Sequence, residues 1–330
     1  MSSVAHPGAG RTLAMGEDEA RLAGRRMVEA PFGRALVRLG GERPDIVGLT
    51  ADLGKYTDIH PFRDAYPDRF FNVGMAEQNL IAVAAGLART GFTAFATTYG
   101  VFATRRAYDF VAIACAHSQL DVKIVAGLPG LTTGYGGTHQ AIEDLALMRM
   151  IPNLVVIDPC DAIEIEAATR AAAEHKGPVY MRQLRGQVPV VLGEDYRFEI
   201  GKARVLREGS DIGVVSTGLM TERALDASAA LAKRGISVGI LHVPTIKPFD
   251  QEAVAAFCAG VDHLVTAENH VVSGGLASLV AEALFDAGSA RQLTRIGLPD
   301  RFIPCGSVPT LQSTYGLSTE AIIARLEKLG

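Results

Sequence analysis

The chain has 330 residues, of which 48% are hydrophobic, and it carries a formal net charge of −4. A single core stops growing at about 250–300 residues, so this length favours two domains. The net charge is slightly acidic and the sequence has no basic run, so a nucleic-acid partner is not expected. No apolar run approaches the length of a membrane span, so a membrane partner is not expected either.

The N-terminal stretch MSSVAHPGAGRTLAMGEDEA lacks the apolar core of a signal peptide, and residues 1–22 are expected to form a flexible tail. The cysteines lie far apart and form no CxxC pair; they are Cys115, Cys160, Cys258 and Cys305. This spacing favours buried, reduced thiols in a cytoplasmic protein.

Residues 23–190 alternate short β-branched runs with amphipathic segments. The pattern predicts strands over 45–52, 69–74, 93–99, 122–128, 153–159 and 178–184. Helices are expected within 73–92 and over 102–117, 140–150 and 162–177. Continuous apolar strands that alternate with helices indicate a parallel sheet covered on both faces.

Residues 187–210 are mixed and turn-rich, which indicates a connection between domains. The alternation then restarts, with strands expected over 211–218, 237–244, 262–269 and 293–299 and helices over 221–235, 275–288 and 319–329. The fold class is therefore predicted to be α/β, with two doubly wound domains over residues 23–190 and 191–330.

Ligands of parallel sheets bind at the carboxyl ends of the strands, which directs attention to the loops that follow them. Glu77 opens an almost entirely apolar helix directly after the strand at 69–74. One interpretation is an acid that complements the helix dipole. The other is a ligand-binding group, because a buried carboxylate needs a partner and no Lys or Arg lies within one turn.

Two further loops carry candidate residues. The stretch TTYGVFATRRAYDF brings aromatic side chains close to Arg105, and a heteroaromatic ring is expected to stack on Phe102; the alternative is ordinary core packing. In GYGGTHQ, glycines permit close backbone approach to a ligand, and Thr138 is expected to cap the next helix. That would place His139 at a helix N-terminus, as a neutral hydrogen-bonding group, unless it merely caps or packs.

Two arginines, Arg182 and Arg185, follow a strand in MRQLRGQ. At a strand end they would clamp an anionic substrate group, and the alternative is a pair of surface arginines.

These segments occur together, and in this order, in a known family. Over residues 25–329 the chain resembles the C-terminal half of transketolase in its two-subunit form, through MAEQN (75–79), THQ (138–140) with EDLALMR (143–149), and IPNLVVIDPCDA (151–162). Its carboxyl half is also similar to 1-deoxyxylulose-5-phosphate synthase in AENHVVSGGLASLV (267–280) and IGLPDRFIPCG (296–306).

The resemblance implies a pyrimidine-binding domain followed by a transketolase C-terminal domain, which together form half of a thiamine diphosphate site. The sequence contains no GDG motif, so the diphosphate and its Mg²⁺ are expected on a separate N-terminal transketolase subunit, within an A2B2 heterotetramer that also uses homodimer contacts. The chain alone is expected to be inactive.

Residue by residue, the resemblance implies that Glu77 hydrogen-bonds a ring nitrogen of the aminopyrimidine and that Phe102 stacks on it. The cofactor pocket would also include Tyr99, Arg105 and Asp52. His139 would lie beside cofactor and substrate, and Arg182 and Arg185 would hold a substrate phosphate.

The Gly-rich loop departs from the family pattern. Leu128 stands where transketolases have a phosphate-binding His, and Tyr135 where they have a substrate-binding Asp, with a one-residue deletion beside it. Because charged hydrogen bonds contribute about 1.5–3 kcal/mol, these losses predict an altered sugar phosphate, a modified ketose or a 2-oxo acid donor.

Four functions therefore stay open. The first is transfer of a two-carbon ketol unit from a ketose or ketose phosphate to an aldose. The others are a decarboxylating carboligase like the synthase, the β-type subunit of a 2-oxoacid dehydrogenase, and a non-catalytic scaffold subunit. Retention of Glu77, Phe102 and His139 together disfavours the last.

Overall fold

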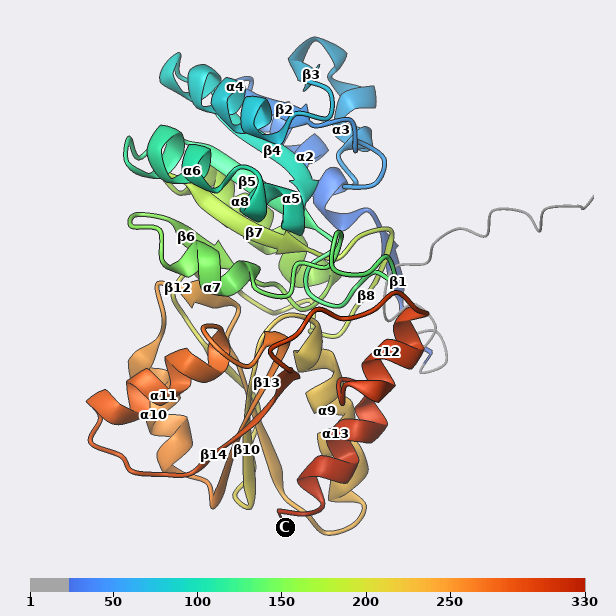
Figure 1. Cartoon of the computed structure of the whole chain (residues 1–330), viewed down its shortest axis with the longest axis vertical. Coiled ribbons are helices and arrows are strands. Elements are labelled where there is room, and N and C mark those ends of the chain that lie inside the picture. The colour runs from blue at the N-terminus through green and yellow to red at the C-terminus, as the bar shows by residue number, and fades with distance from the viewer. Residues whose placement is uncertain (1–23, 330) are drawn as a thin grey trace, which may run out of the picture.

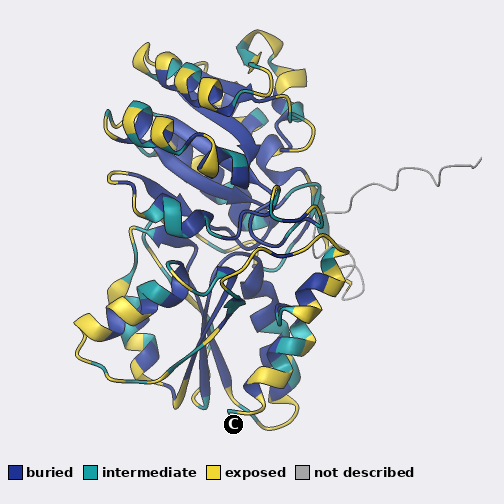
Figure 2. Ribbon diagram, viewed as in Figure 1, coloured by how far each residue is buried: buried dark blue, intermediate teal, exposed yellow. Residues whose placement is uncertain are grey.

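The computed structural model describes residues 24–329, and two sheets organise them (Figure 1). The larger sheet has seven strands in the order β12-β6-β7-β5-β4-β2-β3. Six are mutually parallel: β2 (Ile46–Thr50), β3 (Phe70–Asn72), β4 (Thr93–Tyr99), β5 (Val122–Gly127), β6 (Val155–Ile157) and β7 (Val179–Gln183). Every residue of β2, β4, β5 and β7 is buried, as a sheet covered on both faces requires (Figure 2).

Helices cover both faces of this sheet. On one face, α2 (Pro31–Glu42) and α8 (Ala162–Glu174) pack on Ile46, Phe95 and Met181. On the other face lie α4 (Glu77–Arg89), α5 (Gly100–Arg105), α6 (Tyr108–Phe110), the π-helical η2 (Val111–Ala116) and α7 (Asp144–Arg149). Short elements at the β3 edge are α3 (His60–Ala65) and η1 (Pro67–Arg69).

The second sheet has five strands in the order β14-β13-β10-β11-β9. Four are parallel: β10 (Ile212–Ser216), β11 (Val238–His242), β13 (His263–Val271) and β14 (Leu293–Leu298). β9 (Arg204–Arg207) is the antiparallel edge. Helices α9 (Leu219–Ala232), α12 (Val308–Thr314) and α13 (Thr319–Leu326) pack on one face, and α10 (Gln251–Ala259) and α11 (Leu276–Asp286) on the other.

The α/β architecture predicted from the alternating pattern is confirmed, but the two units are more interlocked than the sequence indicates. β12 (Thr245–Lys247), from the second half of the chain, pairs antiparallel with β6 and extends the first sheet. The expected connection over 187–210 contains two strands, β8 (Gln187–Pro189) and β9. β8 pairs with β1 (Met27–Glu29). The domain limits at residues 190 and 191 stay a prediction.

The helix predicted over 102–117 is broken into α5, α6 and η2. The tail expected over residues 1–22 lies outside the described residues. Within residues 24–329, no helix combines the length and the apolar character that a membrane crossing needs.

Candidate functional site

The candidate site lies at the carboxyl edge of the larger sheet. The loop after β2 carries Asp52, α4 begins at Glu77, α5 follows β4 and carries Phe102, and a long loop follows β5. We call residues 128–141 the His139 loop. Parallel strands bring their carboxyl ends to one edge, so segments that are far apart in sequence become neighbours there.

Glu77 does have a partner, although the local sequence offers none. Its residue is 3% exposed, and Arg106 Nη1 donates a hydrogen bond of 3.0 Å to its carboxylate from 29 residues further along the chain. The Arg106 guanidinium also lies 4.0 Å from the centroid of the Phe102 ring. A planar cation therefore bridges the buried acid and the aromatic face, and Glu77 has a protein partner that the local sequence did not reveal.

Three aromatic rings surround His139. The centroids of Tyr99, Phe102 and Tyr135 lie 6.2, 5.5 and 5.4 Å from the imidazole centroid, each at an edge-on angle. Burial raises the pKa of Tyr99, and the charge of Arg185 opposes that rise. The structure thus brings four of the predicted site residues into one cluster beside the Arg106–Glu77 pair.

His139 is not at a helix N-terminus. Helix α7 begins at Asp144, and His139 lies in the preceding turn, where its backbone N–H donates to Gly136 O. Thr138 Oγ1 lies 2.9 Å from His139 Nδ1 instead of capping the helix. The helix-dipole argument for a neutral imidazole therefore does not apply, because the dipole acts only within the first turn of a helix.

Arg105 points away from Glu77. Its guanidinium pairs with Glu143, donates to Gly137 O at 2.5 Å, and lies 5.6 Å from the centroid of Phe302. In this structure Arg105 braces the His139 loop, while its neighbour Arg106 reaches the acid. The sequence singled out Arg105 and missed Arg106.

Asp52 and Asn72 are joined by two hydrogen bonds. Asn72 Nδ2 donates to Asp52 Oδ1 at 2.9 Å, and Asp52 N donates to Asn72 Oδ1 at 3.0 Å. Asn72 Oδ1 also accepts from Gly74 N at 3.1 Å. These hydrogen bonds fix the chain that leads into α4. Asn72 is a second residue that sequence reasoning missed.

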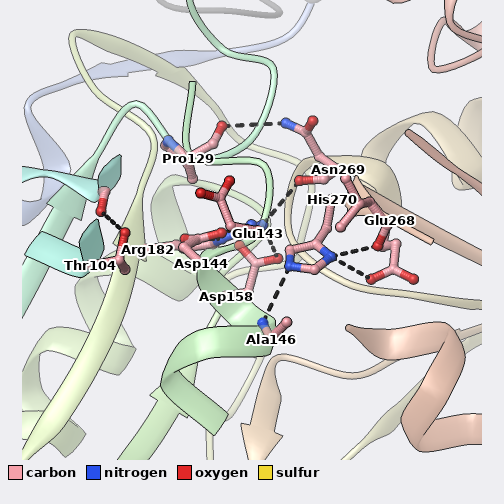
Figure 3. A network of polar contacts seen from close by, with 12 residues as sticks. Thr104, Pro129, Glu143, Asp144, Ala146, Asp158, Arg182, Glu268, Asn269 and His270 are labelled. Carbon is pink, nitrogen blue, oxygen red and sulfur yellow. Dashed lines mark hydrogen bonds and ion pairs between the residues drawn. The ribbon is translucent and has the colours of Figure 1, made fainter. Parts of the chain in front are cut away.

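Arg182 is buried and lies beside Asp144 and Asp158 (Figure 3). It is 1% exposed; its Nε donates to Asp144 at 2.8 Å, its Nη2 also bonds Asp144, and its Nη1 donates to Asp158 at 3.2 Å. Burial works against its charge, yet the two carboxylates raise its pKa. The expectation that Arg182 clamps a substrate anion is corrected here, because its donors are already used by internal acids.

Arg185 is half-buried and lies closer to the cluster. Its positive charge acts on both Tyr99 and Asp58, and burial is what raises the pKa of Asp58. Among the residues that the structure describes, Arg185 Nε has no hydrogen-bond partner. Leu128 packs against Tyr99 and Phe102 and so gives the site an apolar wall.

One group within residues 24–329 has the spacing of metal ligands: Cys160, Glu164 and His242. Its members are fully buried and already bonded, since His242 Nε2 lies 2.8 Å from Glu164 Oε2 and Tyr196 OH donates to Glu164 Oε1 at 2.5 Å. Mg²⁺ prefers octahedral oxygen ligands and retains waters, so this group does not fit Mg²⁺.

Two family models match this chain. Residues 26–190 match the model for the transketolase pyrimidine binding domain, and residues 201–322 match the model for the transketolase C-terminal domain. A solved structure described as a split gene transketolase, inactive beta4 tetramer, superposes with a TM-score of 0.83 at 42% identity, over 91% of this chain and 97% of that one.

Curated relatives agree with these matches. A putative uncharacterized transketolase family protein of Sinorhizobium fredii is 56% identical over 91% of this chain and 88% of its own length. A 6-deoxy-6-sulfo-D-fructose transketolase subunit of Clostridium sp. is 40% identical over 84% of this chain and 86% of its own length. A 1-deoxy-D-xylulose-5-phosphate synthase of Syntrophotalea carbinolica is 38% identical over 94% of this chain and 49% of its own length. The resemblance predicted from the motifs is thereby confirmed.

Proposed function

This chain belongs to the transketolase family, and we propose that it is the C-terminal subunit of a two-subunit transketolase. The reaction would move a two-carbon ketol unit from a ketose or ketose phosphate donor to an aldose acceptor. The observation that carries the proposal is the buried Glu77 carboxylate, which faces the Phe102 ring across a planar cation.

The family implies thiamine diphosphate, and the residues present suit its aminopyrimidine. Arg106 is a flat, positively charged group with N–H donors, and it uses the acid and the ring face at the same time. An aminopyrimidine is also flat, and its ring nitrogen carries an N–H donor in the imino tautomer, so the same two groups suit it. Glu77 would accept its hydrogen bond and Phe102 would stack on its face.

When bound, thiamine diphosphate supplies the carbanion chemistry of the reaction. The protein side chains orient the reactants and hold protons. Glu77 would keep the heterocycle in one orientation from a water-poor position, and His139 would donate or accept a hydrogen bond at the substrate oxygen atoms. Tyr99, Tyr135 and Arg185 would line the side from which an anionic substrate enters.

The diphosphate and Mg²⁺ are assigned to a partner subunit. Two exposed apolar residues support an interface next to the site: Phe110 in α6 is 39% exposed and Ile113 in η2 is 60% exposed, and both follow the turn that carries Arg106. The relative described as an inactive beta4 tetramer supports self-association without activity. We therefore propose that the chain is inactive until the partner joins it in an A2B2 heterotetramer.

Donor choice is proposed to differ from the pentose phosphates. Leu128 and Tyr135 offer no charge to a substrate, and one relative is named as a transketolase subunit for a sulfo-substituted fructose. A modified ketose is therefore our first candidate donor. The match to the synthase keeps a decarboxylating carboligase as the second candidate function.

The test is reconstitution with the product of a neighbouring gene that encodes the diphosphate-binding subunit. The complex, thiamine diphosphate and Mg²⁺ would be screened against ketose phosphates, modified ketoses and 2-oxo acids. Transfer without CO₂ release supports the transketolase, CO₂ release from a 2-oxo acid supports the carboligase, and acyl transfer to lipoamide supports a 2-oxoacid dehydrogenase. No turnover with any donor would leave the scaffold subunit as the answer.

Glu77→Gln provides the sharper arm of this test. We expect kcat to fall by roughly 10²–10³-fold while folding survives, because losing a positioned proton-handling group typically costs about 10²–10⁴-fold. The matched control is Glu252→Gln, an exposed first-turn acid of α10, for which kcat should stay unchanged. Wild-type turnover from Glu77→Gln would refute the role of Glu77.

A further inference from the structure

The His139 loop starts from a strained backbone. Leu128, which is not a glycine, has a φ of +54° and directly precedes Pro129. Left-handed conformations of branched residues persist only where the surroundings fix them. Gly130 N donates to Ala141 O at 2.8 Å and closes the base of the loop, but this bond alone does not fix the peptides beyond it.

Asn269, on β13 of the second sheet, restrains the start of the loop. Its Oδ1 accepts from Leu131 N at 2.8 Å. Its Nδ2 donates to Pro129 O at 3.4 Å (Figure 3). Asn269 is 3% exposed, so both bonds are shielded from water. A carboxamide suits this place because it carries one acceptor and one donor side by side.

The glycine at position 130 of the loop leaves room for Asn269. A Cβ added at Gly130 would lie 2.2 Å from Asn269 O and 2.5 Å from Asn269 Cγ, which no real contact permits. Gly130 also has a φ of +56°. The glycine is therefore required both by its own conformation and by the approach of the second domain.

The second domain holds the loop at further points. Gln312, on α12, donates to Leu131 O at 3.1 Å, so both backbone polar groups of Leu131 bond side chains of that domain. Gly306 N donates to Gly134 O at 3.0 Å. The loop that carries Tyr135 and His139 is thus held by the second domain as well as by Arg105 of the first, and the rings it faces, Tyr99 and Phe102, belong to the first.

We propose that Asn269 is a positioning residue that fixes the His139 loop and thereby sets His139 against Phe102 and Tyr99. The inference rests on the proposed function only where it concerns turnover; the hold on the loop is independent of any substrate. It gives the second domain a role in the site, although none of the predicted site residues lies in that domain.

The first experiment uses the full chain without activity. Hydrogen exchange followed by mass spectrometry would compare wild type with Asn269→Ala over residues 129–141. Losing one buried bond to Leu131 N–H should speed exchange of this peptide by at least about tenfold, while α8 and β10 keep their protection. Carbethoxylation of His139 should accelerate as well. Unchanged exchange in a folded Asn269→Ala variant would overturn the proposal.

The second experiment uses the reconstituted enzyme. Since displacement of a catalytic group by about 1 Å can cost roughly 10²-fold, kcat should fall by about 10- to 100-fold in Asn269→Ala. The apparent KM for thiamine diphosphate should stay within about twofold, because Glu77 and Phe102 lie outside the loop. A loosened loop with unchanged kcat, or an equal loss in cofactor affinity, would also overturn it.

Two further variants secure the result. Gly130→Ala would push the loop off Asn269 from the loop side and should reproduce the fast exchange even if Asn269→Ala does not fold. Gln292→Ala is the control, since it removes an exposed carboxamide from the loop before β14 of the same domain. If the wild-type complex transfers no two-carbon unit, the proposed function fails, and the exchange experiment still decides the role of Asn269.

Discussion

Two arginine–carboxylate pairs in this chain have the same chemistry but differ in burial and in the number of hydrogen bonds that join them. At the site edge, the Arg106 side chain is 50% exposed and Glu77 is 5% exposed, and one bond of 3.0 Å joins them. At the junction of the two sheets, the side chain of Arg182 is 2% exposed and that of Asp144 is 0% exposed. The second pair is bidentate and is reinforced by Tyr180 OH, which donates to Asp144 at 2.6 Å.

The difference separates an exchangeable pair from a fixed one. Water can solvate Arg106 when it leaves Glu77, so a ligand with a suitable donor can replace it at low cost. Arg182 cannot leave its site at low cost, because its withdrawal would leave the carboxylates of Asp144 and Asp158 buried without a counter-ion. Burial, not residue type, therefore decides which arginine belongs to the site and which to the scaffold.

The fixed pair should give the largest effect when it is broken. In Asp144→Asn, Arg182 keeps its charge but loses its main partner, and we expect the free energy of unfolding to fall by about 3–5 kcal/mol. Denaturant unfolding at fixed protein concentration measures this. The control is Asp109→Asn, an exposed acid on α6, which should cost less than about 0.5 kcal/mol. Equal effects of the two substitutions would remove the distinction between the pairs.

The junction should also make stability depend on pH. Burial raises the pKa of Glu268 to about 7. The backbone N–H groups of Leu276 and Ala277 donate to its carboxylate and partly oppose this rise. His270 Nδ1 lies 3.7 Å from this carboxyl. Because the folded-state pKa exceeds the unfolded value of about 4.3, the folded state binds the extra proton between these two pH values.

The contribution of Glu268 is therefore complete below about pH 4.3 and is lost as the pH rises through 7. We expect it to account for a fall of up to about 3 kcal/mol in unfolding free energy between pH 4.5 and pH 8. Urea unfolding across this range measures the fall, and Glu268→Gln should flatten it. An unaltered pH profile in that variant would assign the effect to another group.

The exchangeable pair should give the smallest effect on stability. Arg106→Gln should change the free energy of unfolding by less than about 1 kcal/mol, because half-exposed pairs contribute little. In the reconstituted complex it should tighten thiamine diphosphate binding by up to about fivefold, since the guanidinium no longer competes for Glu77. Calorimetric titration of the complex measures this, and weaker binding would show that Arg106 assists the cofactor instead.

The sequence by itself determined the α/β architecture and indicated which strand-end residues form the candidate site. Alternating apolar strands and helices specified two α/β units, because the two periodicities are local properties of the chain. The positions of Glu77, Phe102 and His139 at strand ends followed from the same alternation. The motifs around them predicted the family, which the matches over 26–190 and 201–322 confirm.

Only the tertiary structure decided which charged groups meet. Arg105 is the last residue of α5 and Arg106 is its C-cap, so the point at which this short helix ends and turns selects which of them reaches Glu77. Arg182 was drawn inward by Asp144 and Asp158 from other elements, and Asn269 reaches the His139 loop from 138 residues away. Such contacts depend on how two sheets pack together, and no local pattern in the chain encodes that packing.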